Sequence, residues 1–180
     1  DGETPLMIAC SMGYTEIVKA LLGAKADPNK QNKDGMSPLR GACRWGRFEA
    51  VSELIKAHAD PLIRDKDGET PLHVACWFGW PNVVELLLQV IRNNQSDWNV
   101  KSNEGETPLY KACSNGSVSV VEVLLRNGVM PSVIPPISHG SDVIQVSASR
   151  GNVEILRMML KVTAGVDINT LTDEDRETPL

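Results

Sequence analysis

Residues 67–80 read DGETPLHVACWFGW, and this stretch is one copy of a pattern that returns along the chain. Its Thr-Pro-Leu core begins at Thr70 and has counterparts that begin at Thr4, Ser37, Thr107 and Thr178. The starts at 4, 37 and 70 lie 33 residues apart, and the next comes 37 residues later. A fixed period in this range is typical of a solenoid built from stacked repeats.

Each copy carries the signals of two helices followed by a turn. In the first copy, Thr4 suits an N-cap, Pro5 suits the first helical position, and Gly13 suits the left-handed residue that ends a helix. Residues 17–22 then give the apolar stripe of a second, half-buried helix. Ala-Asp and Asp-Gly pairs supply the turns between units.

The stretch DGETPLHVACWFG, followed by a Val/Leu-rich helix and an Ala-Asp loop, resembles the ankyrin repeat along essentially the whole chain. The resemblance implies an all-α fold: an ankyrin-repeat solenoid of stacked helix-turn-helix units joined by β-turn or hairpin loops. We expect a single domain over residues 1–180, with repeats at about 1–33, 34–66, 67–103, 104–139 and 140–174 and the start of a sixth at 175–180. Neither end shows the polar cap that solenoids normally carry, so we expect a fragment of a longer array.

Two repeats depart from the pattern. Four extra residues follow Leu88 in the third repeat, and we expect them to lengthen its second helix by about one turn. The fifth repeat reads Asp142-Val143-Ile144 where Thr-Pro-Leu belongs, although Gly151 still marks the end of its first helix.

Charge and hydropathy exclude two classes of partner. The formal net charge is −5 and the chain contains no run of Lys and Arg, whereas nucleic-acid binding needs a clustered basic face. The most apolar segment, residues 83–91, is interrupted by Glu85 and Gln89 and is too short to cross a bilayer. We therefore expect no nucleic acid and no membrane insertion.

Four cysteines occupy one equivalent position in successive repeats: Cys10, Cys43, Cys76 and Cys113. Stacked helices lie about 8–10 Å apart, which is too far for shared zinc coordination and for a disulfide. We expect small, buried, reduced core residues and no metal or cofactor. Reduced cysteines favour an intracellular setting, cytoplasmic or nuclear.

The sequence offers little for catalysis. His73 lies at the family's usual histidine position, where it is expected to tie a turn to a helix by hydrogen bonds. The recurring acidic pairs Asp1/Glu3, Asp67/Glu69 and Glu104/Glu106 are interpreted as solvated turn positions. Phosphate-binding loops, nucleophile elbows and HExxH motifs are absent from the sequence. We expect no catalytic residues and a non-enzymatic protein.

Binding residues follow from the resemblance, which implies that variable positions around the Thr-Pro-Leu turn and at the end of the first helix line a concave face. Repeats two and three place aromatic and basic side chains there, the types most enriched at binding hot spots. The candidate partner-binding residues are Met12, Lys33, Met36, Arg44, Trp45, Arg64, Lys66, Trp77 and Phe78. The alternative is that the three rings only cover helix ends or face a neighbouring segment.

Three further residues have mainly structural interpretations. Trp80 is expected to pack at the base of a second helix, and Trp98 to clamp the lengthened helix or offer a second contact on the convex side. Asn29 matches the loop position at which the resemblance implies asparaginyl hydroxylation, with an unmodified loop residue as the alternative.

The sequence thus predicts a non-enzymatic protein–protein interaction scaffold that binds a partner protein or peptide on its concave face, centred on repeats two and three. It leaves the oligomeric state open, with a monomer as the expectation. One alternative is a substrate-recruiting or autoinhibitory module of a larger enzyme or channel. A purely structural spacer is a third hypothesis, and it predicts no exposed aromatic cluster.

Overall fold

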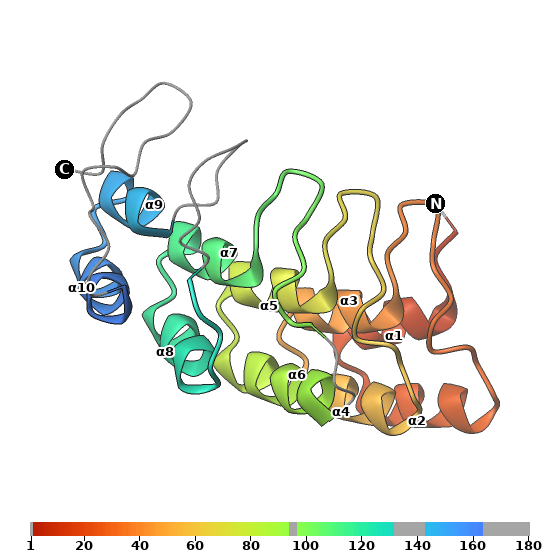
Figure 1. Cartoon of the computed structure of the whole chain (residues 1–180). Coiled ribbons are helices and arrows are strands. Elements are labelled where there is room, and N and C mark those ends of the chain that lie inside the picture. The colour runs from red at the N-terminus through yellow and green to blue at the C-terminus, as the bar shows by residue number, and fades with distance from the viewer. Residues whose placement is uncertain (1, 94–96, 132–142, 164–180) are drawn as a thin grey trace.

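The structure, a computed structural model, describes residues 2–93, 97–131 and 143–163, and within these residues it is all-helical. The first helices of the repeats form one row and the second helices another (Figure 1). The first row is α1 (Pro5–Met12), α3 (Pro38–Arg44), α5 (Pro71–Phe78), α7 (Pro108–Asn115) and α9 (Val143–Ser149). The second row is α2 (Thr15–Gly23), α4 (Phe48–Lys56), α6 (Pro81–Asn93), α8 (Val118–Arg126) and α10 (Val153–Val162). The predicted helix-turn-helix solenoid is confirmed.

The first helices begin and end where the sequence predicts. The Thr4 hydroxyl accepts a hydrogen bond from the backbone N–H of Met7 at 3.2 Å, and Pro5 occupies the first turn. Gly13 ends the helix with φ of 77°, a left-handed conformation that favours glycine. Ser37 and Thr107 form the same cap in later repeats, so one local rule sets the start of each unit.

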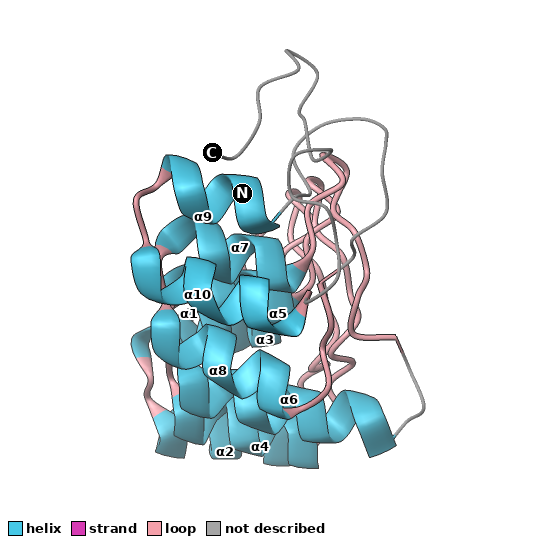
Figure 2. Ribbon diagram, turned by 60° about the vertical axis from the view of Figure 1, so that its left-hand side comes forward, coloured by secondary structure: helices cyan, strands magenta, loops and turns pink. Residues whose placement is uncertain are grey.

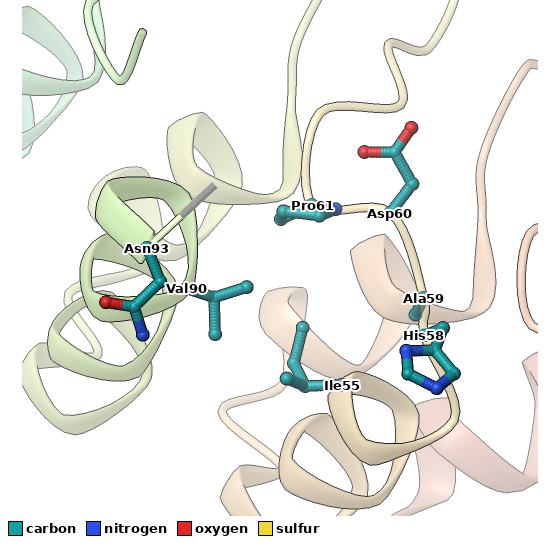
Figure 3. A pocket seen from close by; sticks show the side chains of 7 residues that line it. All are labelled: Ile55, His58, Ala59, Asp60, Pro61, Val90 and Asn93. Carbon is teal, nitrogen blue, oxygen red and sulfur yellow. The ribbon is translucent and has the colours of Figure 1, made fainter. Parts of the chain in front are cut away.

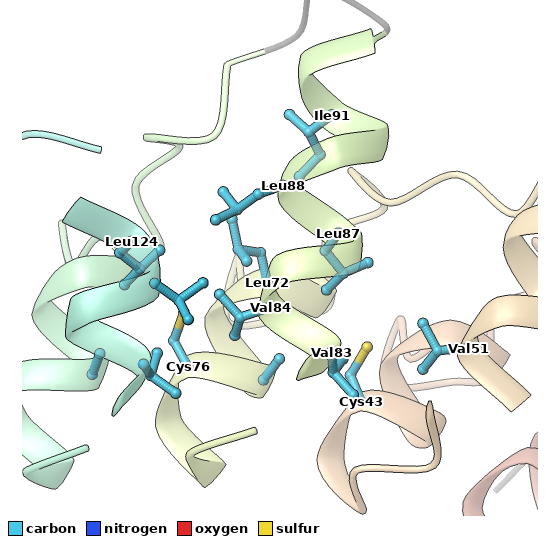
Figure 4. Close-up of a cluster of buried hydrophobic side chains, with 14 of the residues drawn as sticks. Cys43, Val51, Leu72, Cys76, Val83, Val84, Leu87, Leu88, Ile91 and Leu124 are labelled. Atoms are coloured by element: carbon cyan, nitrogen blue, oxygen red, sulfur yellow. The ribbon is translucent and has the colours of Figure 1, made fainter. Parts of the chain in front are cut away.

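The core lies between the two rows of helices and runs along the array. Figure 4 shows Val83, Val84, Leu87 and Leu88 of α6 directed into this layer, and all four are buried. Most of their equivalents in α4 and α8 are buried as well, and Ile55 and Leu125, the equivalents of Leu88, are half-buried against the core, so the apolar side chains of successive repeats form one continuous cluster. Burial of this apolar surface, about 25 cal/mol per Å², is the main force that holds neighbouring repeats together.

The lengthened helix predicted for the third repeat is confirmed. Helix α6 has 13 residues, whereas α2, α4 and α8 have nine each. The added turn is packed into the array, because Ile91 is buried and Arg92 donates a 2.6 Å hydrogen bond to the carbonyl of Asn127. The Arg92 guanidinium also lies 5.7 Å from the Trp98 ring centroid, which places Trp98 against the added turn as predicted.

All four cysteines are free thiols buried in the first row of helices, as their spacing predicts. Burial raises the pKa of Cys10 and of Cys113 to about 12, and it also raises the pKa of Cys43 and of Cys76 well above the ordinary value of a thiol. These thiols stay protonated at neutral pH and behave as small apolar side chains.

The loops that precede the first helices gather along one side of the stack (Figure 2). Adjacent loops bind each other, since the Lys66 N–H donates to the Asp34 carbonyl at 3.0 Å and the Asn103 N–H to the Asp67 carbonyl at 2.9 Å. His73 adds a side-chain link, because its Nε2 lies 3.1 Å from the Glu106 carbonyl. Its Nδ1 accepts from the Thr70 N–H at 3.1 Å, so the predicted tie between turn and helix also reaches the next repeat.

The division into repeats stays a prediction, and the expected sixth repeat at 175–180 lies outside the described residues. Within the described residues, repeats one to five each contribute one pair of helices.

Candidate functional site

Three aromatic side chains are exposed at the ends of neighbouring first helices. The exposed fractions are 52% for Trp45, 41% for Phe78 and 38% for Trp77. They point outward because Cys43 and Cys76, earlier in the same turns, occupy the buried side of α3 and α5. We call the exposed set Arg44, Trp45, Trp77 and Phe78 the aromatic patch. Met12 is exposed at the equivalent end of α1.

Arg44 joins the two repeats of the aromatic patch. Its guanidinium carbon lies 5.4 Å from the Phe78 ring centroid and 5.7 Å from that of Trp45, within the range of cation–π attraction. Among the residues that the structure describes, no carboxylate lies within 4.0 Å of this guanidinium. Arg44 is therefore a cation held by aromatic rings, without a counter-ion from the described chain.

Lys111, which sequence reasoning missed, lies against the patch from the fourth repeat. Its Nζ lies 5.4 Å from the Trp77 ring centroid and also forms ion pairs with Glu69, at 2.8 Å, and with Glu106. Burial lowers the pKa of Lys111, but hydrogen bonds to Glu106 and Glu69 and their negative charges outweigh burial and raise it. Lys111 stays charged at neutral pH and fixes one face of the Trp77 ring.

The expectation that the acidic turn pairs are solvated is wrong for two of their members. The side chains of Glu69 and Glu106 are only 18% and 16% exposed, because both face Lys111. Glu69 also lies 3.9 Å from Arg40, whose Nε donates to Asp65 at 2.5 Å. Their partners Asp67 and Glu104 are exposed, as predicted.

The predicted basic residues of the loops differ in the contacts that they make. Lys33 is exposed, and Lys66 forms a 3.0 Å ion pair with Asp34. Arg64 serves the scaffold, because it donates to the carbonyls of Gly68 at 3.1 Å and Lys101 at 2.8 Å. Met36 is half-buried, with its sulfur 3.1 Å from Nη1 of Arg40.

Trp80 has the structural position that the sequence predicts. Its indole N–H donates to the Arg44 carbonyl at 3.2 Å. Its ring lies over Gly46, where a Cβ atom would approach the ring to 2.5 Å. This contact fixes the end of α3 and thereby the backbone that carries Arg44 and Trp45.

A hollow of about 410 Å³ lies between the end of α4 and the added turn of α6 (Figure 3). Its lining is Ile55, His58, Ala59, Asp60, Pro61, Val90 and Asn93. In Figure 3 the Asp60 carboxylate and the His58 ring point in different directions, so they do not form an acid–base pair. Within the described residues, no group of three or more His, Cys, Asp or Glu side chains could hold a metal ion.

Asn29 bridges two loops near this hollow. Its side-chain oxygen accepts from the Asp60 N–H at 2.8 Å, and its amide nitrogen lies 3.5 Å from the His58 carbonyl. The side chain thus links the first repeat to the second.

Comparison with known families agrees with this geometry. A model of ankyrin repeats in three copies matches residues 1–65 and 42–135, so the chain belongs to the ankyrin-repeat family. Members of this family generally mediate protein–protein interactions and are typically non-enzymatic. No curated protein matches the chain. None of the helices in the described ranges combines the length and apolar character needed to cross a membrane.

Proposed function

We propose that this array is a non-enzymatic scaffold that binds a partner protein or peptide through its aromatic patch, on the face formed by the first helices and their loops. The observation that carries the proposal is the exposure of Trp45, Trp77 and Phe78 on neighbouring repeats. Contiguous exposed apolar side chains mark interaction sites, and Trp and Arg dominate binding hot spots.

The surroundings of the patch support the same function. Arg44 and Lys111 hold the rings from two repeats, so a partner meets a surface that is already ordered. Ordering before binding lowers the entropic cost of association. Met12 and Lys33 extend the proposed surface as exposed side chains, Lys66 and Arg64 as loop cations, and Met36 as a half-buried neighbour.

The test compares affinity capture by the parent array, Trp45→Ala, Phe78→Ala and Met130→Ala. Met130 is a matched exposed apolar residue outside the patch, with an exposed fraction of 57%. A true partner should still bind Met130→Ala. Its binding free energy should weaken by about 2 kcal/mol or more with either Trp45→Ala or Phe78→Ala. Melting curves verify that each variant folds. A partner that binds all four proteins equally would place the interaction elsewhere and overturn the proposal.

Two smaller proposals accompany this function. Asn29 is a candidate for hydroxylation, supported by its half-buried loop position, and peptide mass analysis of protein from animal cells tests it. An unmodified peptide there leaves only the loop-bridging role. The four buried free thiols support an intracellular setting, which fluorescence microscopy of the tagged protein tests.

A further inference from the structure

Arg44 differs from Arg40 and Lys111, two other cations near the patch, in having no acidic partner. Arg40 is neutralised by Asp65, and Lys111 by Glu69 and Glu106. The charges of these residues are therefore satisfied within the array. In the described part of the chain, the Arg44 guanidinium forms two cation–π contacts and no ion pair. An external anion would meet one uncompensated, oriented positive charge at this point.

The geometry around Arg44 suits a carboxylate. A guanidinium that stacks on aromatic faces keeps its N–H edge free, and that edge matches a carboxylate with two parallel hydrogen bonds. The Trp45 and Phe78 rings restrict the guanidinium, so less freedom is lost on binding. The same rings, exposed by 52% and 41%, offer apolar surface beside the charge.

Charge along the row of first-helix ends favours an acidic ligand. The five segments that end the first helices and enter the second helices read SMGYT, RWGRF, WFGWP, SNGSV and SRGNV. Together they contain Arg44, Arg47 and Arg150 and no Asp or Glu, although the chain as a whole has a net charge of −5. The next acidic residues, among them Glu49, lie in the first turns of the second helices. The row is a basic strip in an acidic protein.

We propose that Arg44 is a carboxylate receptor, and that the partner's docking segment is a peptide with an Asp or Glu beside a large apolar side chain. The carboxylate pairs with the Arg44 guanidinium while the apolar side chain covers Trp45 or Phe78. This inference rests on the proposed function and names the chemistry of its partner. Nucleic acid fits the surface less well, because its affinity comes from many phosphate contacts and this strip offers only three arginines.

The experiment selects binders from a random-peptide library displayed on phage, with the intact array as bait, so the partner need not be known. The parent should enrich peptides with an Asp or Glu next to an aromatic or aliphatic residue. Arg44→Glu should lose this preference and enrich Lys or Arg instead. Arg44→Gln should bind the acidic peptides of the parent about 10- to 100-fold more weakly, the loss expected for a hydrogen-bonded charged pair.

Arg47→Glu is the matched control, because Arg47 lies in the same basic strip and its replacement changes the net charge by the same amount as Arg44→Glu. Arg47 is exposed, and its Nε donates to the Ser11 carbonyl at 3.2 Å. It should keep the acidic preference. If Arg47→Glu lost the preference for acidic peptides as fully as Arg44→Glu, the attraction would be a general electrostatic one. That result would overturn the proposal that Arg44 is a carboxylate receptor. The proposal would also be overturned if the peptides enriched by the parent array contained no acidic residues. In that case the proposed function would survive if Trp45→Ala still abolished enrichment.

A single-stranded oligothymidine tests the other class of ligand by fluorescence anisotropy at physiological salt, about 0.15 M. The peptide proposal expects no binding above that of a control acidic protein. Tight binding of the oligonucleotide that Arg44→Glu abolishes would overturn the assignment to a peptide. Thermal melting of every variant separates loss of binding from loss of the fold.

Discussion

Replacing Gly46 by alanine should destabilise the array by about 2–5 kcal/mol, because two costs coincide there. Gly46 has φ of 61°, and a left-handed conformation costs a residue with a Cβ about 1–2 kcal/mol. The new Cβ would also lie 2.5–2.8 Å from three atoms of the Trp80 ring. The rigid indole must move away from this Cβ, and such overpacking costs about 1–3 kcal/mol. This movement also disturbs the hydrogen bond from the indole N–H to the Arg44 carbonyl.

Gly116 is the matched control, since it ends α7 as Gly46 follows α3 and has φ of 76°. An alanine Cβ there would meet only the side-chain amide nitrogen of Asn152, at 3.1 Å, a contact that a shift of a few tenths of an ångström relieves. Gly116→Ala should therefore cost only the conformational part, about 1–2 kcal/mol. The difference between the two glycines reports the contact with Trp80.

A double-mutant cycle measures this contact directly. Urea unfolding followed by far-ultraviolet circular dichroism gives the free energy of unfolding for Gly46→Ala, Trp80→Ala and the double variant. In the Trp80→Ala background, Gly46→Ala should cost about 1–2 kcal/mol, so the two changes should couple by about 2 kcal/mol. Equal costs in both backgrounds would refute the proposed packing of the ring on the glycine.

Three other expectations follow from single residues. His58→Gly should stabilise the array by about 1 kcal/mol in thermal melting, because His58 has φ of 59° and Gly128 holds the equivalent position; a lower melting temperature would show that the histidine side chain matters more than strain. Burial lowers the pKa of His73, so the unfolded chain binds a proton more readily and stability should fall as pH drops below about 6.5. His73→Gln should weaken this dependence in urea titrations from pH 7 to pH 5, and parallel curves would contradict it. Because burial raises the pKa of Cys76 well above its ordinary value, a thiol reagent at pH 8 should label the native protein slowly and the denatured protein at once, and fast native labelling would contradict the packing.

The helices and the core could be predicted because they depend on signals within one repeat. Thr4, Pro5 and Gly13 fix one unit by local capping rules, and the stripe in residues 17–22 fixes its buried face. The four added residues of α6 are recognised because they lengthen the interval between Thr70 and Thr107 to 37 residues. Repetition strengthens such signals, since each is read several times in one chain.

The contacts around the patch could not be predicted, because they join side chains from different repeats at particular rotamers. Lys111 binds Glu69 of the preceding repeat and stacks on Trp77, and no spacing within one repeat indicates this. The sequence therefore predicts a solvated Glu69, whereas the carboxylate belongs to an ion-pair network. Arg64, a predicted binding residue, also donates hydrogen bonds to the carbonyls of Gly68 and Lys101, which its position in the repeat does not indicate.

The added turn of α6 bears on which insertions such an array can accept during evolution. Four residues advance a helix by about 400°, so side chains after the insertion keep nearly their original direction. Within the added turn itself, Ile91 comes four residues after the buried Leu87 and also falls on the buried side of the helix. An insertion of two residues would rotate that direction by about 200° and turn an apolar side chain outward. Selection should therefore retain insertions close to whole helical turns at this end of the second helices, and remove the others.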